Sequence, residues 1–211
     1  MLDKKKLMLY AITDPAYEEK KPLDVLIREA AAGGVRLIQL REKNLSKENF
    51  LNKAMRAKSV CDQHGVLLII NDDIDIALKV CAAGVHVGLE DAPVEEIRRK
   101  AGKDFIIGAT AKTVDQALQA EKCGADYLGV GAVFPSPTKR QAVRITKEEL
   151  GEITESVTIP CVAIGGITQE NIDELAGTGI SGVAVVSAIF GAEDIIEAAQ
   201  RLKQKTERVI G

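Results

Sequence analysis

Two cations and an amide fall on one side of a predicted strand near position 40. The segment RLIQLREK occupies residues 36–43, and its first six residues are predicted to form a strand. Because side chains alternate across a strand, Gln39, Arg41 and Lys43 share one face, and the apolar residues between them face the other way. Converging cations suit an anionic ligand such as a phosphate or pyrophosphate. A surface turn with solvated charges explains the same residues, so this segment alone leaves both interpretations open.

Carboxylates follow the next two predicted strands. Asp72 ends the run 67–72, directly after Asn71, and Asp91 lies in the loop after the run 84–88. If these strands are neighbours in a sheet, Asp72 and Asp91 meet at the same end of it. Mg²⁺ binds one or two carboxylates together with substrate oxygens, which is what a Mg²⁺–pyrophosphate complex needs. We therefore predict that Asp72 and Asp91 are metal ligands.

Helix capping is the competing explanation for these acids. Asp73 and Asp91 each come before a predicted helix, where an aspartate commonly accepts a hydrogen bond from the first turn. Pro93, near the start of the second of these helices, favours capping. We assign Asp73 and Asp75 to capping and to the surface, whereas Asp91 remains open to either role.

The loop after the sixth predicted strand combines hydroxyls with cations. It reads FPSPTKR over residues 134–140 and carries Ser136, Thr138 and Lys139. A lid that closes on a polyanion has this composition, and so does an exposed loop rich in turn-forming residues. Both interpretations remain open at this point.

Glycines follow the seventh predicted strand. Gly165 and Gly166 come before a helix predicted to begin at Thr168, and Val186 and Ser187 lie near the end of the eighth strand. Glycines let backbone N–H groups approach a ligand closely, and a helix N-terminus adds more donors. In barrels of parallel strands, the loops after strands seven and eight commonly bind phosphate. We predict a phosphate site here, with a tight turn as the simpler alternative.

Neither the histidines nor the cysteines form a recognisable catalytic or metal motif. His64 is predicted at a helix end, and His86 inside the fourth strand, where a hydrogen-bonded core or mouth residue is expected rather than a base. The four cysteines, at positions 61, 81, 123 and 161, include no CxxC pair. We expect small buried thiols and no zinc site, and therefore a reduced, cytoplasmic protein.

The scaffold must bring the ends of many strands together. Eight apolar runs alternate with eight amphipathic segments, and most of the runs are continuously apolar, as in parallel sheets covered on both faces. The strands are predicted at 7–13, 36–41, 67–72, 84–88, 104–110, 127–132, 160–166 and 182–189. The helices are predicted at 22–32, 46–63, 73–82, 93–101, 113–123, 146–155, 168–176 and 192–208. This alternation favours one (β/α)₈ TIM-barrel domain over residues 1–211, with a doubly wound open sheet as the alternative.

Composition excludes several classes of function. The 211 residues carry 28 Lys and Arg against 31 Asp and Glu, a formal net charge of −3, and aromatic residues make up 3%. Such a chain lacks the basic surface and the stacking platforms of nucleic-acid-binding proteins. We expect no membrane span and no signal peptide, because no run reaches ~20 apolar residues and Asp14 and Pro15 interrupt the N-terminal one. Small-molecule substrates are the expected partners, and a homo-oligomer remains open.

Taken in order along the chain, these motifs resemble the thiamine phosphate synthase family. The matching stretches are YAITDP, GGVRLIQLREKNLS, LIINDD, GVHVGLEDAP, ADYLGVGAVFPSPTKR, VAIGGIT and VAVVSAI, which run over nearly the whole chain. The resemblance implies a (β/α)₈ barrel that joins 4-amino-2-methyl-5-hydroxymethylpyrimidine diphosphate to 4-methyl-5-(2-hydroxyethyl)thiazole phosphate. It implies a transferase that forms a C–N bond, releases thiamine phosphate and pyrophosphate, and requires Mg²⁺.

The resemblance also assigns roles to residues. Ligands of the pyrimidine diphosphate are implied for Gln39, Arg41, Lys43, Asn71, Thr110 and Lys139, and Mg²⁺ ligands for Asp72 and Asp91. Ser136 and Thr138 match hydroxyls near the thiazole phosphate, and Gly166, Val186 and Ser187 match backbone phosphate contacts. Catalysis is expected to depend on Arg41, Lys43, Thr110 and Lys139.

Two stretches depart from the family pattern. Residues 108–112 read Gly-Ala-Thr-Ala-Lys where the family usually has Gly-Val-Ser-x-His, so Thr110 keeps the hydroxyl and Lys112 replaces an imidazole. The segment RQAVRIT, at 140–146, is also shorter than is typical of the family. Two other functions fit the barrel: a thiazole tautomerase, which needs a positioned base but no pyrophosphate–Mg²⁺ cluster, and a non-catalytic regulator that binds a phosphorylated ligand.

Overall fold

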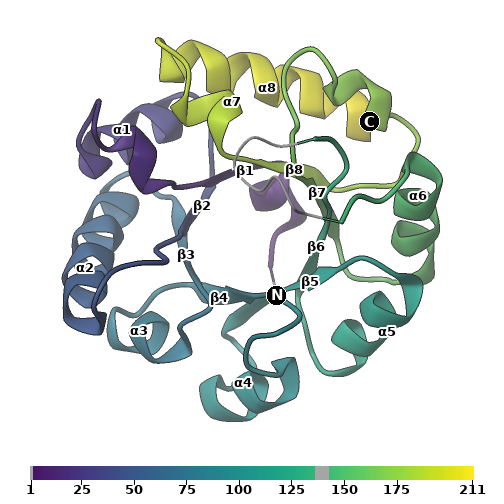
Figure 1. The fold of residues 1–211 in the computed structure, drawn as a ribbon, viewed down its shortest axis with the longest axis horizontal. Coiled ribbons are helices and arrows are strands. Elements are labelled where there is room, and N and C mark those ends of the chain that lie inside the picture. Colours follow the sequence, from purple (N-terminus) through teal and green to yellow (C-terminus); the bar gives the residue numbers. More distant parts are fainter. Residues whose placement is uncertain (1, 136–142) are drawn as a thin grey trace.

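Eight parallel strands form a closed barrel in the computed structural model, which describes residues 2–135 and 143–211 (Figure 1). The strands pair in sequence order, and the last pairs with the first. They are β1 (Leu9–Ile12), β2 (Leu37–Leu40), β3 (Leu67–Asn71), β4 (Gly84–Val87), β5 (Ile106–Ala111), β6 (Tyr127–Gly131), β7 (Cys161–Ile164) and β8 (Gly182–Val185). The predicted (β/α)₈ barrel is confirmed, and the alternative of an open sheet is wrong.

Helices connect the strands and surround the barrel (Figure 1). The α-helices are α1 (Leu23–Ala32), α2 (Lys47–Gln63), α3 (Ile74–Lys79), α4 (Val94–Ala101), α5 (Val114–Lys122), α6 (Lys147–Ser156), α7 (Ser187–Phe190) and α8 (Ile195–Ile210). Short 3₁₀ helices occur at η1 (Lys4–Leu7), η2 (Pro15–Tyr17) and η3 (Ile172–Leu175). In the described part of the chain, no helix is long and apolar enough to cross a membrane.

Side-chain caps fix the starts of several helices. Ser46 accepts a hydrogen bond from the backbone N–H of Asn49 at the start of α2. Asp73 does the same for α3, through the N–H of Ile76 at 2.9 Å. Each bond satisfies a donor that has no partner within the helix. The capping role predicted for Asp73 is therefore confirmed.

The chain after β7 differs from the prediction. Of the helix expected at 168–176 only η3 forms, and Thr168 accepts a hydrogen bond from Glu170 within a turn rather than capping a helix. Positive φ angles at Gly177 (79°) and Gly179 (71°) end the helical geometry nearby. The strand expected at 182–189 ends at Val185, and residues 187–189 of the expected range belong to α7 instead. A short apolar run does not distinguish a strand from a helical turn.

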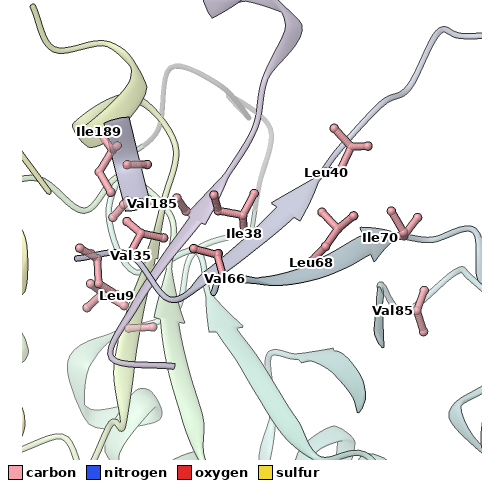
Figure 2. Packing of buried hydrophobic residues seen from close by; sticks show 14 of the residues in the cluster. Leu9, Val35, Ile38, Leu40, Val66, Leu68, Ile70, Val85, Val185 and Ile189 are labelled. Carbon is pink, nitrogen blue, oxygen red and sulfur yellow. The ribbon is translucent and has the colours of Figure 1, made fainter. Parts of the chain in front are cut away.

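Two apolar layers hold the barrel together. The larger one joins outward-facing strand residues to the helices, and Figure 2 shows Ile38 and Leu40 of β2 among its side chains. The smaller one fills the barrel and includes Leu37, also from β2. Because inward and outward residues alternate, Gln39 lies on the inner face with Leu37, as the sequence predicts.

The cysteines are less uniformly buried than expected. Cys61 and Cys161 are buried, and burial raises the pKa of each thiol to about 12. Cys123 is partly exposed, and Cys81 is exposed in the turn that follows α3. The prediction of a buried thiol is therefore wrong for Cys81, which lies in a turn with a positive φ of 52° between the buried residues Val80 and Ala82.

Candidate active site

A cavity of about 460 Å³ lies at the carboxyl ends of the strands. This volume is typical of sites that bind small molecules. Its lining includes seven of the predicted substrate ligands: Gln39, Arg41, Asn71, Thr110, Gly166, Val186 and Ser187. They come from β2, β3, β5 and the loops after β7 and β8, so barrel closure gathers residues that are far apart in the sequence. The predicted ligands Ser136, Thr138 and Lys139 lie outside the described residues.

Lys43, Asp72 and Asp91 form a charged cluster beside this cavity. Nζ of Lys43 lies 2.6 Å from Oδ2 of Asp72, and the side chains of Asp72 and Asp91 contact each other. The prediction that neighbouring strands bring these two carboxylates together is confirmed. Asp72 directly follows Asn71, which lines the cavity, so the cluster lies at the margin of the cavity.

The Asp72 carboxyl is electrostatically unfavourable in its ionised form. Burial raises its pKa, the ion pair with Lys43 lowers it, and the neighbouring Asp91 raises it; the net pKa lies above the ordinary value of 3.8. Two ionised carboxylates in contact repel each other, and one lysine compensates only one of them. A cation bound between Asp72 and Asp91 would relieve this repulsion.

Asp91 does not cap the helix that follows it. Its Oδ2 accepts a hydrogen bond from the backbone N–H of Gly88 at 2.7 Å, and α4 begins after Pro93 without a side-chain cap. The capping explanation is therefore wrong for Asp91. Its carboxylate is instead held within the loop after β4, next to Asp72.

Asn71 carries a buried donor that has no partner among the described residues. Its side chain belongs to a residue that is 8% exposed, and its Nδ2 makes no hydrogen bond within the described part of the chain. Leaving such a group unpaired costs about 1–3 kcal/mol. Because Asn71 lines the cavity, an oxygen atom of a bound ligand would satisfy this donor.

The loop after β7 passes close to the chain that leaves β6. Gly165 and Gly166 have φ angles of 102° and 65°, and a Cβ on Gly166 would collide with the backbone of Phe134 and Pro135. Asn171 holds the loop by donating from Nδ2 to the carbonyl of Gly166 at 2.9 Å. Both glycines are half-buried and line the cavity, and the phosphate site itself stays a prediction.

The departure from the family pattern at residues 108–112 contributes to the wall of the cavity. Thr110 of β5 and Lys112, the residue directly after β5, both line it. The backbone N–H of Lys112 donates to Oε1 of Gln116 at 2.9 Å, which fixes the end of the strand. The residues that set this chain apart from the family pattern therefore border the candidate site.

Sequence reasoning missed two tyrosines inside the barrel. Tyr10 and Tyr127 are buried with their hydroxyl oxygens 3.0 Å apart. Nδ1 of His86 lies 3.2 Å from the Tyr127 hydroxyl, and His86 is 9% exposed, so the expectation of a hydrogen-bonded core residue is confirmed. A signal was available, because a buried phenol in an otherwise apolar strand needs a hydrogen-bond partner.

Fold and site together define a (β/α)₈-barrel protein whose mouth suits an anionic small molecule. Cations, paired carboxylates and an amide donor that has no partner within residues 2–135 and 143–211 meet there at the carboxyl ends of the strands, where barrel enzymes bind their substrates. Comparison with known families narrows this class. The chain belongs to the thiamine monophosphate synthase family, whose model matches residues 9–189.

Individual relatives align with this chain over nearly their whole lengths. The chain is 47% identical to the thiamine-phosphate synthase of Clostridium beijerinckii over 93% of this chain and 94% of that protein. It is 43% identical to thiamine-phosphate synthase 2 of Streptococcus pneumoniae over 99% of this chain and 100% of that protein. The solved structure of thiamine phosphate pyrophosphorylase from Pyrococcus furiosus superposes with a TM-score of 0.89 at 41% identity and covers 99% of both chains.

Proposed function

We propose that this chain is a thiamine phosphate synthase, which joins 4-amino-2-methyl-5-hydroxymethylpyrimidine diphosphate to 4-methyl-5-(2-hydroxyethyl)thiazole phosphate. The C–O bond to the diphosphate breaks, pyrophosphate leaves with the electron pair, and the thiazole nitrogen forms the new C–N bond. The proposal is supported by family membership and by relatives that carry this name over nearly the whole chain. The transfer needs no strong protein base, because the electron-rich aminopyrimidine stabilises the developing cation.

The observation that carries the proposal is the concentration of unsatisfied charge and hydrogen-bonding capacity on one side of the cavity. The buried Nδ2 donor of Asn71 has no partner among the described residues, and Arg41 lines the same cavity. Lys43 lies at the margin with Asp72. Donors and cations in such an arrangement stabilise a leaving diphosphate as its negative charge grows, without reorganising during the reaction.

Asp72 and Asp91 fit a Mg²⁺ ion as two carboxylate ligands. Their contact raises the pKa of Asp72 after burial has already done so, and a divalent cation would relieve both effects. Across the described residues, no group of three or more His, Cys, Asp or Glu side chains could hold a metal ion alone. This agrees with the usual Mg²⁺ site, in which substrate phosphate and water complete the coordination. When bound, Mg²⁺ would neutralise charge on the pyrophosphate.

The remaining roles follow from position and from family resemblance. Arg41, Lys43, Thr110 and Lys139 act on the diphosphate or the reacting pyrimidine, and Gln39 and Asn71 orient that substrate. Ser136, Thr138, Gly166, Val186 and Ser187 bind the thiazole phosphate. The four thiols require a reducing environment to stay unpaired, so we place the enzyme in the cytoplasm.

The direct experiment mixes the purified protein with both substrates and Mg²⁺ and measures thiamine phosphate. We expect turnover that stops when EDTA removes the metal and returns when Mg²⁺ is added. Conversion of a thiazole carboxylate phosphate without the pyrimidine substrate would instead identify a tautomerase. Tight binding of a phosphorylated ligand with no conversion of any of these compounds would identify a regulator.

A further inference from the structure

Four hydrogen bonds link five side chains across the floor of the cavity. Gln39 donates from Nε2 to the hydroxyl of Tyr10, which lies 3.0 Å from the hydroxyl of Tyr127. The Tyr127 hydroxyl lies 3.2 Å from Nδ1 of His86, and Nε2 of His86 lies 3.2 Å from Oγ1 of Thr110. Gln39 and Thr110 both line the cavity, so the chain of hydrogen bonds begins and ends there.

Glycines on two strands make room for this chain. A Cβ on Gly108 of β5 would collide with the ring of Tyr127, and a Cβ on Gly129 of β6 would lie 3.0 Å from Cε1 of His86. Position 108 therefore needs a residue without a side chain, and at position 129 a side chain would require the His86 ring to shift by a few tenths of an ångström. The inside of a barrel is normally filled by branched apolar side chains, so the space given to polar rings here calls for an explanation.

The hydrogen atoms along the chain can be followed from Gln39. Burial raises the pKa of both phenols, so each tyrosine keeps its hydrogen at neutral pH. Within the described residues, the Tyr10 hydroxyl bonds only to Gln39 and Tyr127. Since Gln39 already donates to it, Tyr10 must give its own hydrogen to Tyr127. The reverse arrangement would leave the Tyr10 hydrogen unpaired in a dry interior, which is costly.

The same reasoning continues to the other end. Tyr127 accepts from Tyr10 and therefore donates to Nδ1 of His86. An imidazole that accepts at Nδ1 carries its hydrogen on Nε2, and it donates from there to Oγ1 of Thr110. The hydroxyl of Thr110, having accepted this bond, is left with its own hydrogen to donate.

We infer that this series of hydrogen bonds has one direction, with each group donating to the next from Gln39 to Thr110. It fixes His86 in the neutral Nε2–H form, so that Thr110 donates its hydrogen into the cavity. Tyr10, Tyr127 and His86 are then positioning residues, and Thr110 selects a ligand with a hydrogen-bond acceptor. The identity of this ligand rests on the proposed function, in which a ring nitrogen of the aminopyrimidine is the acceptor.

Nitrogen NMR of the histidine rings tests the direction without any substrate. The sequence has two histidines, and His64 is exposed at the end of α2, so it serves as an internal reference. We expect His86 to show a protonated Nε2 and an unprotonated Nδ1 at neutral pH. Tyr127→Phe and Tyr10→Phe should each move His86 toward a mixture of the two forms and leave the His64 signals unchanged.

Tyr17→Phe is the matched control, since Tyr17 is the third tyrosine of the sequence and makes no hydrogen bond through its hydroxyl among the described residues. It should leave His86 unchanged. A proton on Nδ1 in the unaltered protein would overturn the inference, and so would a His86 signal that neither Tyr127→Phe nor Tyr10→Phe changes. Thermal melting of each variant shows whether the fold is retained.

A second experiment compares the binding of the pyrimidine diphosphate with that of an analogue in which the acceptor ring nitrogen is replaced by C–H. The unaltered protein should bind the analogue at least about tenfold more weakly, because the Thr110 donor then lacks a partner. Thr110→Val should abolish this preference, and Thr110→Ser should restore it. Equal binding of both compounds by the unaltered protein would contradict the donor role. Absence of any turnover would count against the proposed function, whereas the NMR result judges the direction of the chain independently.

Discussion

Nζ of Lys53, in α2, lies 2.5 Å from Oε1 of Glu42, the residue between Arg41 and Lys43. The same ammonium lies 2.5 Å from Oε1 of Glu18, in the loop after β1. Burial lowers the pKa of Lys53, but the ion pairs with Glu18 and Glu42 outweigh it, and the pKa is raised. Glu42 is thus anchored to α2, while its neighbour Arg41 lines the cavity.

Replacing Lys53 tests this anchor. Lys53→Met leaves two carboxylates without a counter-ion, and the Glu42 side chain is only 3% exposed. We expect the free energy of unfolding to fall by about 3 kcal/mol. The KM for the pyrimidine diphosphate should rise more than kcat falls, since Arg41 loses its orientation. Denaturant unfolding and steady-state kinetics measure both effects.

Lys58→Met is the matched control for Lys53. Lys58 lies on the same helix and pairs with Asp62, whose side chain is 60% exposed. Such a pair contributes about 0–1 kcal/mol, so this variant should be nearly as stable as the unaltered protein. Equal stability of the two variants would show that the Lys53 pairs do not anchor β2.

Asp91→Ala tests the metal site. If Asp91 binds Mg²⁺, kcat should fall by about 100-fold or more, as when one preorganised electrostatic group is removed. The loss of stability should be modest, about 1 kcal/mol, because the carboxylate accepts a hydrogen bond from Gly88 but caps no helix. Asp75→Ala removes an exposed acid paired with Lys100 and should leave turnover unchanged. Normal turnover and normal Mg²⁺ dependence in Asp91→Ala would exclude Asp91 from the site.

The pKa of Asp72 predicts how stability depends on pH without metal. Its folded-state pKa is raised above 3.8 by burial and by Asp91, so the folded protein binds the proton more tightly than the unfolded chain does. This contribution is fully present below pH 3.8 and is lost as the pH rises through the folded-state pKa. At neutral pH the ionised Asp72 therefore destabilises the metal-free protein.

Asp72→Asn should consequently raise the melting temperature of the metal-free protein at pH 7 while lowering its activity. The orphaned Lys43 has a side chain that is 50% exposed, so losing its partner costs little. Adding Mg²⁺ should stabilise the unaltered protein more than the variant. Melting curves with and without Mg²⁺ at several pH values measure these effects, and a lower melting temperature of metal-free Asp72→Asn at pH 7 would contradict the argument.

Thr110→Ser tests whether the departure at this position is tolerated. The hydroxyl bonded to His86 survives and only a methyl group is lost, so we expect kcat/KM to change by a few-fold at most. A loss of more than about 100-fold, equivalent to about 2.7 kcal/mol, would mean that the methyl group is required.

The fold could be predicted from sequence because most strands are continuous apolar runs and amphipathic segments alternate with them. The predicted elements differ from the structure after Thr168 and beyond Val185, where the segments are too short for periodicity to identify them. The meeting of Asp72 and Asp91 was predictable, since both follow neighbouring strands. The order of the strands alone was enough to predict that these two carboxylates lie close together.

Contacts that cross the barrel or join it to a helix were not predictable in the same way. Tyr10 and Tyr127 are 117 positions apart, on strands that do not pair, and their contact depends on the radius of the closed barrel. The pairing of Lys53 with Glu42 depends on how α2 is rotated against β2. Neither quantity can be read from local patterns of polar and apolar residues.

The close fit between Gly108 and Tyr127 restricts the order in which this interior can change over generations. A lineage that first enlarges residue 108 passes through a protein in which the new side chain collides with the rings of Tyr127 and His86. A lineage that first shortens residue 127 passes through a closed barrel with an internal void, which costs about 3–5 kcal/mol but leaves the fold intact. Because a Cβ at residue 108 would also lie 2.5 Å from Nδ1 of His86, new pocket chemistry at this depth is reached by way of positions 127 and 86, with position 108 following.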